Sequence, residues 1–256
     1  MPKNFIINFM SIYQQPNIFD PNKLPRNYRD LEQFNLLASA SAQFNEDELK
    51  NIVLKESNKK ITVVDLRLEY HGFWKNKEVS FKNILQNVNS DAKFNYNHNQ
   101  EKNILLDIID NNYNSLYPNF FSLELTDSSN QQEISTEQEI CLKNNCNYQR
   151  FPMQDHHFPN IEQLQQIIEF LKNIESNPNS KIHVHCAAGR GRTAIFLVIY
   201  DILKNHHNST IQEIFFRHAQ LGGADLSNIQ NEYEWSDAEK KHISILYDLY
   251  YQLKKN

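Results

Sequence analysis

The sequence predicts an α/β fold in which a central, mostly parallel sheet is flanked by helices. Short apolar or β-branched runs alternate with stretches of helical periodicity, most regularly from residue 135 onward. No internal repeat and no low-complexity linker divides the chain. We therefore expect a single domain over residues 25–256, preceded by an irregular segment over 1–24 that holds three of the eight prolines.

The elements of the first half rest on two kinds of signal. Asn45 and Glu48 have capping-box spacing ahead of apolar residues, which indicates the start of a helix, and β-branched side chains dominate residues 61–66. Residues 71–98 lack periodicity, so we assign no regular element there. In order, we expect a strand at 36–41, a helix from 45, a strand at 61–66 and a helix over 104–109.

In the second half, stretches with helical periodicity alternate more clearly with short strand-like runs. Ser135 and Gln138 have capping spacing again, ahead of a short apolar stretch. In order, we expect a short helix after Ser135, a strand at 148–153, a helix from about 161, a strand at 181–185, a very apolar helix at 193–203, a helix around 211–215 and a last helix near 243–253.

Charge and hydropathy exclude several classes of protein. The formal net charge is −5 and the pI is about 6.1, so a global basic field for nucleic acid is absent, and any anionic ligand has to be held by a local cluster of donors. No stretch approaches the roughly 18 apolar residues that cross a bilayer. The apolar run at 5–10 is too short for a secretory signal, so we expect none in this chain, and the compartment and the oligomeric state stay open, with a monomer compatible.

The three cysteines are too few, and odd in number, for a disulfide framework. We interpret Cys141 and Cys146 as ordinary apolar or half-buried structural residues on or just after the short helix that follows Ser135. Cys186 differs, because it opens a glycine-containing loop between a short strand and an apolar helix.

Residues 185–193 have the composition of a phosphate-binding loop. A loop that ends at a helix N-terminus directs backbone N–H groups at an anion, and the helix dipole adds to the attraction. Gly189 and Gly191 permit the unusual dihedral angles that let successive amides converge. The predicted phosphate contacts along the loop backbone are Ala187, Ala188, Gly189, Arg190 and Gly191.

Cys186 is the predicted nucleophile of this loop. The helix N-terminus and Arg192 should lower the pKa of its thiol, so that the thiolate forms at neutral pH. Arg192 can grip two phosphate oxygens as a planar fork. Thr193 can donate its hydroxyl to the thiolate, and His185 can hydrogen-bond the loop backbone.

Three other interpretations of the loop compete with this one. Cys186 would be an ordinary buried thiol in the first. The second, a nucleotide-binding P-loop, lacks the lysine that the P-loop motif requires. The third is a metal site at His183, His185 and Cys186, but Cys186 turns away from the strand face that the two histidines share and no fourth ligand is evident. We expect no metal and no cofactor.

Asp155 is the predicted general acid, since a leaving oxygen needs a proton donor. It follows the strand at 148–153, and side chains at such strand ends meet ligands in parallel sheets. An ordinary turn or helix-cap role is the alternative for Asp155. His156 is a candidate phosphate contact, and for His157 a loop role is at least as good an interpretation.

Three further stretches narrow the interpretation to a family. Residues 39–44 are similar to a Ser-Gly-Ser-Ala-Gln-Phe segment, residues 64–73 to an Asp-Leu-Arg-x-Glu-x-His-Gly-Phe segment, and Asp155-His156 to the end of a Thr-Asp-His acid loop. Together with residues 185–193 they resemble the protein-tyrosine-phosphatase-like phytases, or cysteine phytases, over roughly residues 25–253.

The resemblance implies a protein-tyrosine-phosphatase-like fold and metal-free hydrolysis of inositol polyphosphates. By position it makes Cys186 the nucleophile, Arg192 the phosphate-binding arginine and Asp155 the general acid. The further substrate contacts that it implies are His156, Arg29, Arg67 and His71, of which the last two match a motif that also fits ordering the site from behind.

The sequence departs from the family pattern in ways that concern the substrate. Gln154 stands where threonine is usual, Ala187 where glutamate is frequent, and Arg190 adds a charge that favours a polyanion. Residues 74–100 do not match the family, although the resemblance implies a small β-rich insertion near 71–100. Two alternative functions stay open: a phosphoinositide or phosphotyrosine phosphatase with the same chemistry, and a non-catalytic inositol-phosphate-binding or effector module.

Overall fold

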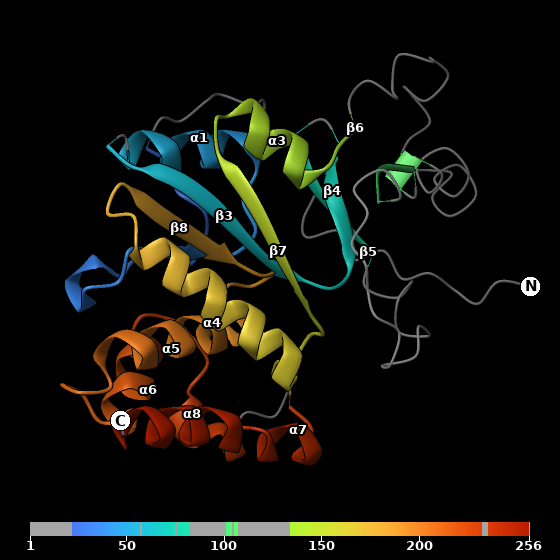
Figure 1. Ribbon diagram of the computed structural model, residues 1–256. Helices are drawn as coiled ribbons and strands as arrows, with labels where there is room; N and C mark the ends of the chain where they lie inside the picture. The colour runs from blue at the N-terminus through green and yellow to red at the C-terminus, as the bar shows by residue number, and fades with distance from the viewer. Residues whose placement is uncertain are drawn as a thin grey trace, which may run out of the picture.

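The structure, a computed structural model, describes residues 22–56, 58–74, 76–81, 101–103, 105–106, 134–231 and 235–255. Its centre is a five-stranded sheet with the strand order β1-β2-β8-β3-β7 (Figure 1). The strands are β1 (Arg29–Asp30), β2 (Ala38–Ser41), β3 (Lys60–Arg67), β7 (Asn147–Met153) and β8 (Ser180–His185). All neighbours pair in parallel except β1, which joins β2 antiparallel at the edge. The predicted fold class is therefore confirmed.

Helices cover both faces of this sheet (Figure 1). On one face lie α1 (Glu46–Lys55) and α3 (Glu137–Lys143), which share a buried cluster with β3. The other face is covered by α4 (Ile161–Glu175) and α5 (Gly191–Asn205), and α6 (Ile211–Gln220) and α8 (Ser244–Lys254) pack on α5. The short helix α7 (Asp237–Lys241) precedes α8 along the chain. Two 3-10 helices, Glu32–Phe34 and Leu226–Asn231, also lie within the described residues.

A second, three-stranded sheet has the order β5-β4-β6. β4 (Tyr70–Trp74) pairs antiparallel with β5 (Lys77–Phe81) and with β6 (Ile134–Ser135). Most of the stretch near 71–100 lies outside the described residues, so the extent of the insertion and the division into domains stay predictions. Of the helix expected over 104–109, residues 105–106 are helical, as are 101–103 before it, and the rest falls outside the described residues.

Capping residues set the starts of the helices predicted from Asn45 and after Ser135, with one correction. The Asn45 side chain accepts a hydrogen bond from Glu48 N–H at 2.9 Å, and the Glu48 carboxylate accepts one from Asn45 N–H at 3.0 Å. The cap expected at Ser135 and Gln138 is wrong by one residue, because Thr136 and Glu139 form the box instead. Ser135 is unavailable for it, since it is the last residue of β6 and pairs with Phe73.

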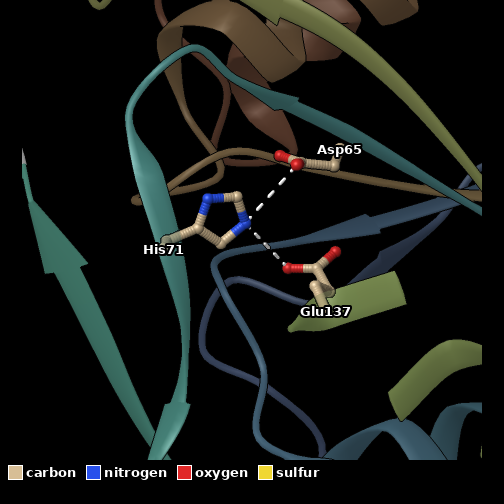
Figure 2. Close-up of side chains that lie close together, drawn as sticks. All are labelled: Asp65, His71 and Glu137. Carbon is tan, nitrogen blue, oxygen red and sulfur yellow. Dashed lines mark hydrogen bonds and ion pairs between the residues drawn. The ribbon is translucent and has the colours of Figure 1, made fainter. Parts of the chain in front are cut away.

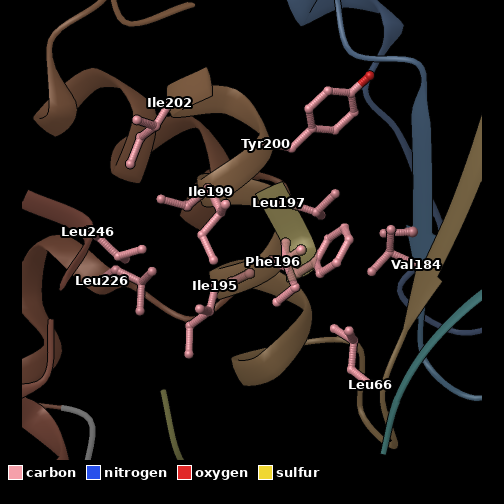
Figure 3. Close-up of a cluster of buried hydrophobic side chains, with 14 of the residues drawn as sticks. Leu66, Val184, Ile195, Phe196, Leu197, Ile199, Tyr200, Ile202, Leu226 and Leu246 are labelled. Atoms are coloured by element: carbon pink, nitrogen blue, oxygen red, sulfur yellow. The ribbon is translucent and has the colours of Figure 1, made fainter. Parts of the chain in front are cut away.

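Helix α5 is buried on all sides and forms the centre of the larger core. Figure 3 shows its apolar side chains between the sheet and the C-terminal helices, with Val184 and Leu66 toward the strands and Leu226 and Leu246 opposite. Every residue of α5 from Arg192 to Ile202 is buried. This packing fixes the first turn of α5, which carries Arg192 and Thr193.

No helix in the described part of the chain is long and apolar enough to cross a membrane.

Candidate active site

The loop between β8 and α5 is held tightly against the segment that follows β2. Gly189 has φ +70°, and a Cβ there would lie 2.4 Å from the carbonyl carbon and oxygen of Ser41. Glycine is therefore required both by conformation and by the close approach of two backbones. Gln43 N–H donates to the carbonyl of Ala187 at 3.2 Å. The segment after β2 thus forms the floor of the loop, which gives the family-like stretch 39–44 a physical role.

Cys186 is buried within this loop, with 3% of its surface exposed. The Thr193 hydroxyl donates to its Sγ at 3.2 Å, and the backbone N–H groups of Thr193 and Gly189 also bond to the sulfur. Burial alone raises the pKa of a thiol, but the charge of Arg192 and these hydrogen bonds outweigh it, so the pKa of Cys186 lies below its ordinary value. The loop favours a thiolate.

Arg192 is buried beside Cys186 and is oriented by three acceptors. Its guanidinium donates to both Glu69 carboxylate oxygens, at 2.8 and 3.2 Å, and to the carbonyl of Met153 at 3.1 Å. Its Nε is buried and has no hydrogen-bond partner among the described residues. An oxyanion held in the loop would supply an acceptor for that donor.

Glu69 connects Arg192 to a second buried arginine. Arg67 Nε donates to Glu69 Oε1 at 2.9 Å, and its Nη1 donates to Gln43 Oε1 at 2.8 Å and to Glu78 Oε1 at 2.6 Å. Burial opposes the charge on Glu69, but Arg192 and Arg67 hold the pKa of its carboxyl well below the usual range. Glu69 is therefore an anion that fixes Arg192, a role that the sequence analysis did not assign.

Asp155 and His156 lie on the loop after β7, next to Arg192. Asp155 Oδ1 is 3.1 Å from Arg192 Nη2, and His156 Nε2 is 3.6 Å from Asp155 Oδ2. Both side chains are 36% exposed. The structure thus brings Asp155, from the loop after β7, next to the loop that carries both Cys186 and Arg192, and Asp155 can reach both solvent and a group bound in that loop.

Arg29 lies beneath the loop instead of projecting from it. Its Nη2 donates to the carbonyl of Gly189 at 2.8 Å, its Nη1 donates to the carbonyl of Asn27, and only 5% of the residue is exposed. Burial lowers the pKa of Arg29 to about 10, although the charge of Cys186 opposes the shift. Asn27 donates to the carbonyls of both Gly189 and Gly222. In this position Arg29 supports the backbone of the loop, and its expected contact with substrate stays a prediction.

Arg67 and His71, two further predicted substrate contacts, are fully buried at 0% exposure, and their polar atoms face other side chains and the backbone. Their motif does not reveal this burial, which is a consequence of tertiary packing. The burial fits the other role that the motif allowed, ordering the site from behind, and a direct substrate contact stays a prediction.

His71 lies between two buried carboxylates (Figure 2). Its Nε2 is 3.1 Å from Glu137 Oε2 and 3.4 Å from Asp65 Oδ2, and the three residues could offer ligand atoms within 4.8 Å of one another. However, Arg150 Nε already stands 3.1 Å from Asp65 Oδ2, and the Tyr148 hydroxyl donates to the same oxygen at 2.7 Å. A divalent ion here would face a fixed guanidinium, so the trio fits a hydrogen-bonded network better than a metal site.

This network reaches the loop through His185. His185 Nε2 is 2.7 Å from Glu137 Oε1, while Gln43 donates to Glu137 Oε2 at 2.7 Å. Burial lowers the pKa of a histidine, but the Glu137 charge and hydrogen bond outweigh it and raise the pKa of His185. The residue before the nucleophile is thus anchored to the first turn of α3, not to the loop backbone.

The remaining loop residues differ in exposure. Ala188 and Arg190 are exposed, Ala187 and Gly191 are half-buried and Gly189 is buried. Sequence reasoning missed Glu69, Glu137 and Asn27. Glu69 lay inside the family-like stretch 64–73, which was the available signal, whereas nothing in the sequence pairs Glu137 with His185.

The three cysteines should differ sharply in reactivity with pH. Burial raises the pKa of Cys141 well above its ordinary value and that of Cys146 to about 11, whereas the pKa of Cys186 is lowered. Because only the thiolate reacts, iodoacetamide at about pH 6.5 should modify Cys186 first, with a rate that falls as acid protonates the sulfur. Peptide mapping by mass spectrometry checks this, with Cys146 as the internal control. Equal rates at Cys186 and Cys146 would mean that Cys186 is an ordinary buried thiol.

Comparison with known proteins agrees with this geometry. The model of the protein-tyrosine-phosphatase-like phytase family, described as "Inositol hexakisphosphate", matches residues 24–204. Effector protein hopD2 of Pseudomonas syringae pv. tomato is 28% identical over 88 residues, which are 34% of this chain and 19% of that protein.

Two solved structures are similar over nearly the whole chain. A PTP-like myo-inositol phosphatase from Mitsuokella multacida, in complex with myo-inositol-(1,3,4,5)-tetrakisphosphate, is 25% identical with a TM-score of 0.72, and the match covers 92% of this chain and 44% of that one. A PTP-like phytase from Bdellovibrio bacteriovorus is 25% identical with a TM-score of 0.67, over 97% of this chain and 93% of that one. The chain spans less than half the length of the Mitsuokella protein and about a fifth of the effector.

Proposed function

The chain belongs to the protein-tyrosine-phosphatase-like phytases, and from that premise we propose that it removes phosphate from inositol polyphosphates through a phosphocysteine intermediate. The observation that carries the proposal is the arrangement at Cys186. A thiol of lowered pKa is bonded by Thr193, and a buried arginine beside it keeps Nε free of partners among the described residues.

The first step transfers the phosphoryl group to the enzyme. The Cys186 thiolate attacks phosphorus as the bond to the leaving oxygen breaks, while Arg192 and the loop N–H groups hold the other oxygens. A phosphate in the loop takes the place of Asp155 beside Arg192 and, as a like charge, favours protonation of that carboxyl. Asp155 then gives its proton to the leaving oxygen.

The second step releases phosphate. Asp155, now ionised, takes a proton from water, whose oxygen attacks phosphorus as the bond to sulfur breaks. The Thr193 hydroxyl, 3.2 Å from Sγ, stabilises the thiolate that departs. Inorganic phosphate leaves and the enzyme returns to its starting state, with no redox change and no metal step.

A polyanionic substrate fits the local charge of the site. The chain carries a net charge of −5, yet Arg190 is exposed on the loop, Arg192 is buried within it and Arg29 lies beneath it. Arginines gathered at one site attract an anion with several phosphates more strongly than a singly phosphorylated one. The inositol tetrakisphosphate bound by the similar Mitsuokella protein belongs to that class.

Phosphate release measured on three substrates tests the proposal. Inositol hexakisphosphate, a phosphoinositide in vesicles and a phosphotyrosine peptide are compared at equal concentration and ionic strength. We expect the highest kcat/KM for the hexakisphosphate, and a decline of this preference with salt, because exposed cations are screened. If the hexakisphosphate is the poorest of the three, the substrate class is wrong. If ligands bind but none is turned over, the chain is a binding module.

A further inference from the structure

The loop that carries Asp155 is packed against the C-terminal segment around α7. Trp235, which is 4% exposed, lies just before α7, and its ring contacts those of His156 and Phe158 at centroid distances of 6.0 and 5.2 Å. A Cβ built on Gly191 would lie 3.2 Å from the same indole. Trp235 therefore touches both the acid loop and the first residue of α5.

Glu239 of α7 makes polar contacts with the same loop. Its Oε2 accepts from Phe158 N–H at 3.3 Å, and its Oε1 is 3.6 Å from His157 Nε2. The other ring nitrogen of His157 lies 2.7 Å from the carbonyl oxygen of Asp155. His157 thus connects Glu239 to the backbone of the predicted acid, and its role is larger than that of an ordinary loop residue.

The backbone beside Asp155 is in a conformation that needs external support. His156 has φ +59°, in the left-handed region, which costs free energy for a residue with a side chain. Such a conformation persists when its surroundings fix it. The three residues after Asp155 each contact Trp235 or Glu239, so these two side chains are placed to provide that support.

We propose that Trp235 and Glu239 are positioning residues for the general acid. They hold residues 155–158 against the first turn of α5, so that the Asp155 carboxylate stands 3.1 Å from Arg192 without a loop closure. The inference rests on the proposed role of Asp155. Both residues lie outside the family match over 24–204, so the match itself assigns them no role.

Leaving-group dependence separates this role from a general structural one. A poor leaving group, such as that of phenyl phosphate, needs the proton of the acid, whereas nitrophenolate departs with much less help. Glu239→Ala should therefore lower kcat/KM for phenyl phosphate by about tenfold and for p-nitrophenyl phosphate by less than about twofold. The tenfold loss is a part of the roughly 10²–10⁴-fold that general acids contribute to the rate. Glu239→Gln, which can still accept from Phe158 N–H, should fall between Glu239→Ala and the wild type.

The control variant is Asp237→Asn, on the same helix with a side chain that is 97% exposed, and it should leave both substrates unchanged. Iodoacetamide reactivity of Cys186 is measured in the Glu239 and Asp237 variants and should stay at the wild-type rate, because the contacts of Glu239 with the acid loop do not involve the Cys loop. Trp235→Leu should repeat the pattern of Glu239→Ala.

Three outcomes overturn the proposal. Equal losses on both phosphates, or a loss of Cys186 reactivity, would give Glu239 and Trp235 a purely structural role, and no loss on either would show that the loop needs no support from α7. Asp155→Asn distinguishes this failure from that of the proposed mechanism. If Asp155→Asn shows no extra loss on phenyl phosphate, Asp155 is not the acid and both proposals fall; if it does, only the positioning role is in question.

Discussion

Replacement of Cys186 by serine is expected to abolish phosphate release, with kcat lower by about 10⁴-fold or more, as for other lost nucleophiles. The surroundings that lower the pKa of the thiol cannot ionise a serine hydroxyl at neutral pH, so the attacking anion is lost while the loop keeps its shape. Phosphate release from inositol hexakisphosphate measures the loss. The ligand should still bind, and more tightly, because its phosphate no longer meets a negative sulfur.

The matched control is Cys146→Ser, the same change at a buried cysteine in the cluster on the opposite face of the sheet. It should keep kcat within about twofold, since only residues that enter the reaction change the barrier so strongly. Ligand binding is followed by the rise of the unfolding temperature with inositol hexakisphosphate. Substantial turnover by Cys186→Ser would eliminate the phosphocysteine route, and loss of both binding and fold would mean that Cys186 is structural.

Features that depend on local sequence could be predicted closely. The loop 186–190, the helix that follows it and the cap at Asn45 are determined by glycines, apolar periodicity and side chains three residues apart. The exception is the cap predicted at Ser135 and Gln138, because the neighbouring pair Thr136 and Glu139 has the same spacing and forms the capping box instead. The position of the cap depends on β6, because Ser135 pairs with Phe73, which lies 62 positions earlier in the chain, and so belongs to a strand.

Features that depend on burial could not be predicted. The family-like stretch 64–73 correctly marked residues of the site, but its pattern does not show that Arg67 and His71 lie behind the loop at 0% exposure while Glu69 contacts Arg192. The same holds for Arg29, whose partner is a loop carbonyl 160 residues away. Charged residues near an anion site can face either the ligand or the backbone that holds it, and only the packed fold decides between the two.

Arg192→Lys should lower kcat/KM by about 10²–10³-fold, the cost of removing a preorganised donor from a developing oxyanion. The guanidinium now satisfies both Glu69 oxygens and the carbonyl of Met153 with Nη1 and Nη2, and still presents Nε. A lysine ammonium has three donors on one atom, so it cannot bridge Glu69 and also align two donors with a phosphate. Because lysine keeps the positive charge of Arg192, the loss of activity reports the lost hydrogen-bond geometry and not a lost charge.

Arg217→Lys serves as the control, because Arg217 makes a similar two-nitrogen contact with the buried carboxylate of Asp201, between α5 and α6. That substitution should lower the unfolding temperature with little change in kcat, whereas Arg192→Lys should lower kcat/KM far more than its effect on unfolding would explain. Comparable activity losses in the two variants would show that Arg192 acts only by holding the fold together. A selective loss at Arg192 instead requires that its free Nε and its fixed plane face the reacting phosphate, which is the central premise of the proposed mechanism.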